Sequence, residues 1–302
     1  MSFHPVRTTP RRFGAHLSLT WWKPLVIIVV PPLVMIILQI ALFAIVGLID
    51  HGSGQTEAVG PLQLLAVNLS MGITGVLTVP LICWWAKVPW RSILSAPRAF
   101  DQRRLAVYLL WALGVTILAN AALALLAPEQ TPWVGVGFTG TTMALLVVIV
   151  LTTPLAAVSE ELMFRGAVMP AVASWVRPER IALALGVIVS SLAFATTHLA
   201  TDPWLFAHHV FLGLATAVMA IRSRGLEAPI AFHVANNTFT AVLNTLLAGG
   251  GDFSVARTAG AGGPHLLIPA LFVLALVIVV WRREGNAAEP EAMSTRHAKG
   301  VR

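Results

Sequence analysis

The chain alternates long apolar runs with short polar segments, and this pattern predicts its architecture. Each run is close to the roughly 20 mostly apolar residues that a helix needs to cross a bilayer. We expect membrane-spanning helices near residues 24–49, 61–86, 105–127, 141–162, 181–198, 204–221, 229–248 and 266–281. The predicted fold class is therefore all-α, a polytopic transmembrane helical bundle of about eight spans.

The composition excludes a soluble protein. Of 302 residues, 57% are hydrophobic and only 11% are charged, whereas soluble domains carry about 25% charged residues. The net charge of +7 does not indicate nucleic-acid binding, because the basic residues lie between apolar runs and form no patch interleaved with aromatic side chains. The single cysteine, Cys83, excludes an intrachain disulfide and a cysteine-based metal cluster.

The basic residues alternate between the two sides of the predicted bundle. Lys and Arg precede the first span and follow spans two, four, six and eight, while the loops after spans one, three and five hold acidic residues instead. Because cytoplasmic loops are enriched in Lys and Arg, we expect both termini in the cytoplasm. Arg257 is the exception, and it lies in a glycine-rich segment, residues 249–263, that we expect to be a flexible external loop.

Two neighbouring glutamates end the fourth predicted span. A single acidic side chain in the middle of a span costs about 2.5 to 3.5 kcal/mol, so Glu160 and Glu161 require an explanation. Adjacent helix positions point about 100° apart. Glu161 can pair with Arg165 four residues later, which leaves Glu160 on a different face. Spacing alone leaves open that all three contact lipid headgroups.

Two further polar pairs follow at helical spacing. Phe194 and His198 lie four residues apart near the end of span five, and His233 and Asn237 lie four apart early in span seven. Taken alone, each pair fits a structural contact between helices. With Glu160 they supply a carboxylate, two imidazoles and a carboxamide, which are the groups that activate water and stabilise the oxyanion of amide hydrolysis.

These motifs, in this order, resemble those of the CPBP group of CAAX-type proteases and bacteriocin-processing enzymes, also called the Abi family. The matching patterns are Glu-Glu-x-x-x-Arg, Phe-x-x-x-His and His-x-x-x-Asn, within residues 141–248. The resemblance implies that Glu160 and His198 activate water. It implies that His233 and Asn237 stabilise the oxyanion. Glu161, Arg165 and Phe194 are then supporting residues.

The implied activity is intramembrane endopeptidase cleavage of membrane-associated or lipidated peptides, in a bacterial cell membrane. Membrane lipid and a peptide or protein substrate are then the expected partners. A noncatalytic membrane scaffold or an immunity-type binding protein with the same fold is the alternative, and a solute transporter is a third hypothesis. The chain divides into a basic segment (1–23), N-terminal spans (24–140), the CAAX-protease-like core (141–248), a loop with the last span (249–281) and a polar cytoplasmic tail (282–302).

The resemblance leaves the role of a metal open. Members of the family are commonly labelled metalloproteases, and Glu160, His198 and His233 are candidate ligands for a tetrahedral zinc site completed by water. The chain has no His-Glu-x-x-His helix motif. A metal-free, glutamate-dependent mechanism uses the same side chains.

The predicted topology conflicts with a single site. Counting along span five places His198 at the opposite end from Glu160 and His233, roughly 20 Å away by helix rise. One site therefore requires span five to be displaced, or the turn at residues 198–203 to lie within the protein at membrane depth. His208 and His209 follow this turn, and we expect them to be anchors at the membrane interface.

Overall fold

The computed structural model describes residues 11–49, 58–250, 253–254 and 257–299. Its elements are α1 (Lys23–Ile49), β1 (Ala58–Val59), α2 (Pro61–Ala86), α3 (Arg91–Leu94), α4 (Gln102–Leu126), η1 (Pro128–Gln130), α5 (Gly140–Glu161), η2 (Leu162–Val168), α6 (Met169–Ala173), α7 (Glu179–Thr197), α8 (Pro203–Ser223), α9 (Glu227–Leu247), β2 (Phe253–Ser254), η3 (Pro264–Leu266) and α10 (Leu267–Lys299).

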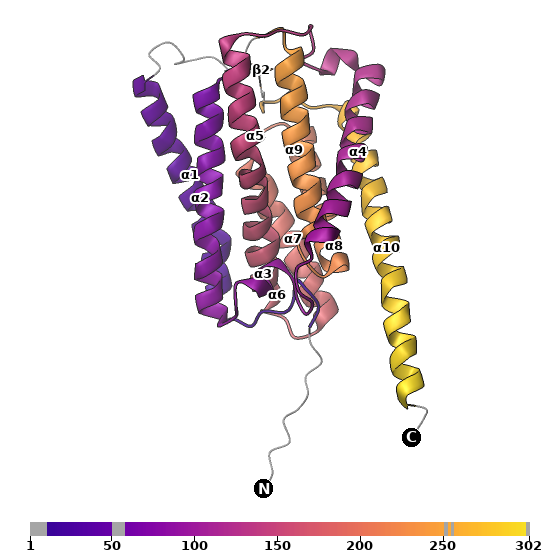
Figure 1. The fold of residues 1–302 in the computed structure, drawn as a ribbon. Coiled ribbons are helices and arrows are strands. Elements are labelled where there is room, and N and C mark those ends of the chain that lie inside the picture. The colour runs from indigo at the N-terminus through magenta and orange to yellow at the C-terminus, as the bar shows by residue number, and fades with distance from the viewer. Residues whose placement is uncertain (1–10, 50–57, 251–252, 255–256, 300–302) are drawn as a thin grey trace.

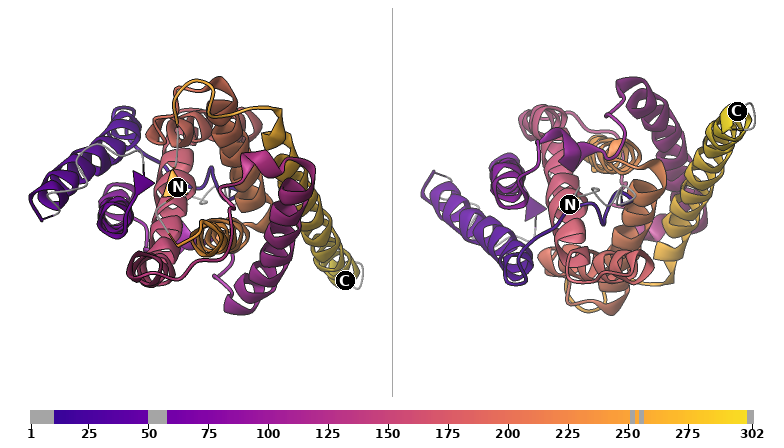
Figure 2. Two further views of the ribbon diagram at one scale, coloured as in Figure 1. Left: turned by 90° about the horizontal axis from the view of Figure 1, so that it is seen from above. Right: turned by 90° about the horizontal axis from the view of Figure 1, so that it is seen from below.

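The long helices form one bundle and run side by side (Figure 1). Seen from either end, α1 and α2 lie at one side, α4 and α10 at the opposite side, and α5, α7, α8 and α9 between them (Figure 2). Helix α1 begins and α10 ends at the same end of the bundle (Figure 1). The predicted helical bundle is confirmed, whereas its cytoplasmic orientation remains a prediction.

Seven helical segments of the described chain are long and apolar enough to cross a membrane, and α9 is not among them. Helix α9 is 21 residues long and packs mainly against α4 and α5 in the middle of the bundle. It is less apolar because it carries His233, Asn236 and Asn237 on surfaces that face other helices or the cavity described below. The seventh predicted span, residues 229–248, is therefore present as an interior helix with a polar face.

The outer helices expose apolar side chains and keep polar contacts inside. On α1, Val29, Leu33 and Ile37 are each at least half exposed, a surface that a soluble protein does not tolerate over its whole length. Inside, Asn68 Nδ2 on α2 donates to Thr153 Oγ1 on α5 at 3.1 Å, the kind of hydrogen bond that joins helices in lipid. This distribution is that of an integral multi-pass membrane protein.

Helix α5 ends at Glu161, close to the predicted limit of residue 162. The backbone nevertheless stays helical through a π-helix, η2, into α6, so that one helical segment runs from Gly140 to Ala173. At the end of η2 the Met169 N–H donates to the Phe164 carbonyl, five residues earlier. Short π-helical turns inside α-helices are often found at functional sites, and this one contains the fully buried Arg165.

The bundle depends on close approaches at glycine. A Cβ added to Gly75 of α2 would overlap the Ser159 Cβ and lie 2.7 Å from its Cα. A Cβ added to Gly213 of α8 would lie 2.9 Å from the Ser191 Cα of α7. Small residues at such crossings let helix backbones approach in lipid, and the first crossing fixes the position of the residue immediately before Glu160.

Replacing Gly75 by Ala should destabilise the protein, because even one methyl group meets the backbone of α5. Overpacking of this kind costs about 1 to 3 kcal/mol. Thermal unfolding in detergent measures the change, and Gly114→Ala on α4 is the matched control, since nothing lies within 4 Å of its added Cβ. Equal midpoints for the two variants would show that α2 and α5 do not approach as closely as described.

Two segments differ from expectation beyond the bundle core. Helix α10 stays helical to Lys299, so the predicted polar tail begins within a helix. In this tail, Glu284 Oε2 pairs with Arg104 Nη2 of α4 at 2.6 Å.

The part of residues 249–263 that the structure describes is not a free loop. Strand β2 pairs antiparallel with β1, and Gly260 N–H donates to Asp202 Oδ2 at 2.9 Å.

Candidate active site

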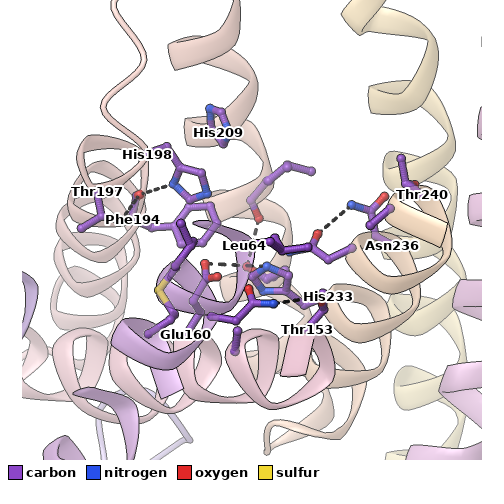
Figure 3. Close-up of a pocket in the computed structure, with 18 of the residues that line it drawn as sticks. Leu64, Thr153, Glu160, Phe194, Thr197, His198, His209, His233, Asn236 and Thr240 are labelled. Carbon is purple, nitrogen blue, oxygen red and sulfur yellow. Dashed lines mark hydrogen bonds and ion pairs between the residues drawn. The ribbon is translucent and has the colours of Figure 1, made fainter. Parts of the chain in front are cut away.

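The predicted catalytic side chains line one cavity of about 470 Å³. Glu160 from α5, His198 at the end of α7, and His233 and Asn237 from α9 all contribute to its wall. Figure 3 shows Glu160, His198 and His233 around a shared space, with the Phe194 ring beside both imidazoles. The structure thus brings together the three motifs that are separated in the sequence.

His198 lines this cavity from the end of α7, and contacts with Arg257 hold the turn that follows. Helix α7 has 19 residues and ends at Thr197, so His198 forms its C-cap. The His198 Nδ1–H donates to the Phe194 carbonyl at 2.9 Å, and Arg257 Nη1 donates to the His198 carbonyl at 2.8 Å. The Thr201 N–H in turn donates to the Arg257 carbonyl at 2.9 Å. Irregular backbone is tolerated at membrane depth when other protein groups satisfy it in this way.

A chain of polar contacts joins α5 to α9. Glu160 Oε2 lies 3.7 Å from His233 Nε2, and the opposite nitrogen, Nδ1, donates to Glu161 Oε1 at 2.7 Å. Glu161 Oε1 also lies 3.3 Å from Arg165 Nη1, which confirms the predicted i,i+4 pair. The bond between Glu161 and His233 was not foreseen, because no spacing along the chain relates α5 to α9.

This cluster is buried and its charges can balance. Glu160 is 4% exposed, His233 is 6% exposed, and Glu161 and Arg165 are fully buried. Uncompensated buried charge is costly. Two carboxylates and one guanidinium leave one negative charge, which a doubly protonated His233 neutralises. In that state the Nδ1–H is held by Glu161 and the Nε2–H points toward Glu160 and the cavity.

Phe194 separates the buried guanidinium from the cavity. Its ring centroid lies 4.5 Å from the Arg165 Cζ and 4.6 Å from the His198 ring centroid. A cation over an aromatic face is attracted by the negative face of the ring. Phe194 therefore packs against Arg165 on one side and His198 on the other, and its supporting role stays a prediction.

Asn237 lines the same wall, one turn beyond His233. The Asn236 Nδ2 donates to Asn237 Oδ1 at 3.1 Å. This contact engages the carboxamide oxygen of Asn237 and leaves its nitrogen to donate to another acceptor.

His208 and His209 line the cavity as well, so their predicted position as anchors at the membrane interface is wrong. The His209 ring stacks on that of His198, with centroids 4.0 Å apart, and its Nδ1–H donates to the Leu205 carbonyl at 2.7 Å. The prediction failed because residue order alone does not show that the first turns of α8 lie beside His198.

The cavity does not present a three-ligand metal site. Among the residues whose positions are described, no three His, Cys, Asp or Glu side chains are arranged to hold an ion. The Glu160 carboxylate faces His233, whereas the His198 ring packs between Phe194 and His209. The expected ligand set of Glu160, His198 and His233 therefore does not fit a tetrahedral site here.

Comparison with known proteins gives one match. The model of a protein family described as type II CAAX prenyl endopeptidase Rce1-like matches residues 140–239, a segment that contains all three motifs. No curated protein and no solved structure matches the chain. Residues 140–239, which supply every side chain of the Glu160, His198, His233 and Asn237 constellation, are therefore similar to the Rce1-like family of CAAX prenyl endopeptidases.

Proposed function

We propose that this protein is an intramembrane endopeptidase that hydrolyses peptide bonds of membrane-associated or lipidated peptides, using water activated by Glu160. The observation that carries the proposal is the state of the Glu160 carboxylate. Its Oε2 is buried, has no hydrogen-bond partner among the described residues, and belongs to a side chain that lines the cavity. A buried, unsatisfied acceptor beside a roomy polar cavity is where an ordered water belongs.

In the proposed reaction, one water lies between Glu160 and His198. Glu160 accepts a proton from this water, whose oxygen bonds to the scissile carbonyl carbon while the carbonyl electron pair moves to oxygen. The His233 Nε2–H and the Asn237 carboxamide nitrogen donate to the resulting oxyanion. When the tetrahedral intermediate collapses, the C–N bond breaks and Glu160 returns the proton to the leaving nitrogen.

Glu161 and Arg165 are proposed to act through His233. The short contact from His233 Nδ1 to Glu161 fixes the ring so that its other nitrogen faces Glu160. Arg165 in turn balances the Glu161 charge and donates through Nη2 to the Gly213 carbonyl at 3.3 Å. This support leaves Glu160 as the one carboxylate of the pair that reaches the cavity.

The experiment that tests this function compares membranes from cells producing the wild-type chain or Glu160→Gln. Mass spectrometry of peptide termini should find new C-termini only where wild-type protein is present. The fragments also identify the substrate. Identical sets of termini in the two membranes would instead support the scaffold or immunity-type binding protein.

Asn237→Asp should lower turnover by about 10² to 10³-fold, the usual loss for one oxyanion donor. The change keeps the size of the side chain but replaces the donating nitrogen by an acceptor. Asn236→Ala is the matched control, because it removes only the group that orients Asn237 and should cost less. Initial rates with the identified substrate measure both effects, and equal rates for Asn237→Asp and wild type would remove Asn237 from the oxyanion site.

A further inference from the structure

Arg257 gives one end of the cavity a distinct character. Among the residues that line the cavity within the described chain, Glu160 is the only acid and Arg257 the only Arg or Lys. Arg257 comes from the segment after α9 that was expected to be an external loop, and it contacts the His198 backbone from there. The cavity therefore carries a carboxylate on one wall and a guanidinium on another.

Arg257 is held by its backbone and by one side-chain bond. Its carbonyl accepts from the N–H groups of Thr201 and Asp202 at 2.9 and 3.3 Å, and its Nη1 donates to the His198 carbonyl at 2.8 Å. A guanidinium has five N–H donors, so most of its donors remain for another acceptor. Within the described residues no carboxylate lies in ion-pair range of Arg257; Asp252 lies outside them.

A cation in the wall of a cavity in a membrane protein needs a partner. Ionisable groups inside membrane proteins are costly and usually mark a substrate or ion pathway. The neighbouring lining residues His198, His208 and His209 add no negative charge. Arginine matches the planar geometry of a carboxylate and binds it through paired N–H donors. The chemistry missing from this end of the cavity is thus that of a carboxylate supplied by the substrate.

We propose that Arg257 binds a carboxylate of the peptide substrate and so holds one side of the scissile bond beside His198. This inference rests on the proposed peptidase function and adds a selectivity to it. Two sources supply the same chemistry: the free α-carboxylate at a peptide's C-terminus, or an Asp or Glu side chain near the scissile bond. If the α-carboxylate binds, the protein prefers peptides whose C-terminus lies close to the cleavage point. If a side-chain carboxylate binds, it prefers cleavage sites next to an internal Asp or Glu.

Binding to Glu160→Gln protein tests the inference without turnover. The probe is a short leucine-rich peptide with a fluorophore at its amino end, prepared with a free C-terminus, with an amidated C-terminus, and amidated with one internal Glu. Adding Arg257→Gln should weaken binding of the preferred carboxylate peptide by about ten- to a hundredfold relative to the plain amide, as expected for hydrogen bonds to a charged group. Arg257→Lys should retain part of the preference.

The ratio of the peptide affinities isolates the carboxylate from any effect on His198, because displacement of His198 affects all three peptides alike. Arg222→Gln is the matched control: Arg222 stacks on Trp281, 4.6 Å from its ring centroid, and is not part of the cavity wall. It should leave the ratio unchanged. Which peptide loses its advantage identifies the source of the carboxylate.

Equal weakening of all three peptides by Arg257→Gln would overturn the inference and make Arg257 a positioning residue for His198. The inference would also be overturned if the Glu160→Gln protein with its native Arg257 bound all three peptides with equal affinity. These failures are distinct from failure of the proposed function. If the wild-type protein prefers the carboxylate peptide but cuts no peptide, the binding site stands and the proposed peptidase function fails. If it cuts all three peptides equally, the peptidase function stands and the carboxylate site fails.

Discussion

Glu160→Gln should reduce peptide cleavage by at least about 10² to 10⁴-fold, the usual contribution of a general base. Glutamine keeps the volume and the hydrogen bonding of the side chain but cannot take the proton from water. The variant should accumulate and unfold like the wild type. Although the change removes one charge from the buried cluster, His233 can give up its second proton, so that Glu161 and Arg165 remain a neutral pair.

The control for this prediction is Glu161→Gln, a change in the neighbouring carboxylate. For each variant, thermal unfolding and initial cleavage rates measured on the same preparation separate a loss of catalysis from a loss of folding. A well-folded Glu160→Gln protein with full activity would exclude Glu160 as the base. A poorly folded one would show that the carboxylate stabilises the bundle rather than acting on substrate.

Glu161→Gln should fail in a different way, by destabilising the protein. It leaves the fully buried Arg165 without its carboxylate, and breaking a buried pair costs about 3 to 5 kcal/mol. The first symptom should be poor accumulation and a lower unfolding temperature. Combining it with Arg165→Gln should recover part of the lost stability, because no unpaired guanidinium then remains.

The double variant should not recover activity to the same extent. Glu161 also accepts the Nδ1–H of His233, and glutamine replaces a charged acceptor by a neutral one, so the orientation of His233 stays weakened. Rates measured on the stable double variant test this point. Wild-type stability of the single Glu161→Gln variant would mean that the pair with Arg165 does not contribute to the fold, whatever its geometry.

The helices were predictable because span length and apolarity are local properties of the sequence. Helix α2 has the predicted limits, residues 61–86, and most other boundaries shift by a few residues. The continuation after α5 was not predicted. The π-helix at residues 162–168 carries the helical backbone past Glu161 through the fully buried Arg165, and the limits of the apolar run do not reveal this.

The candidate site was predictable to the extent that its motifs carry unusual polar groups in apolar spans. The contacts between the motifs were not. The bond from His233 to Glu161, the stacking of His209 on His198 and the position of Arg257 beside His198 join residues of different elements. Such contacts depend on the packing of the whole bundle, which includes the hydrogen bond from Gly260 to Asp202, and no spacing along the sequence predicts them.

The most direct test of the account uses purified protein in lipid vesicles and one peptide identified from the membrane comparison. Wild type and Glu160→Gln are incubated side by side, binding is measured by fluorescence, and products are identified by mass. We expect both proteins to bind the peptide and only the wild type to convert it to two fragments, cut at one peptide bond, whose masses together equal that of the peptide plus one water. Binding without cleavage by the wild type, or equal cleavage by both proteins, would contradict the assignment of Glu160 as the base of an intramembrane endopeptidase.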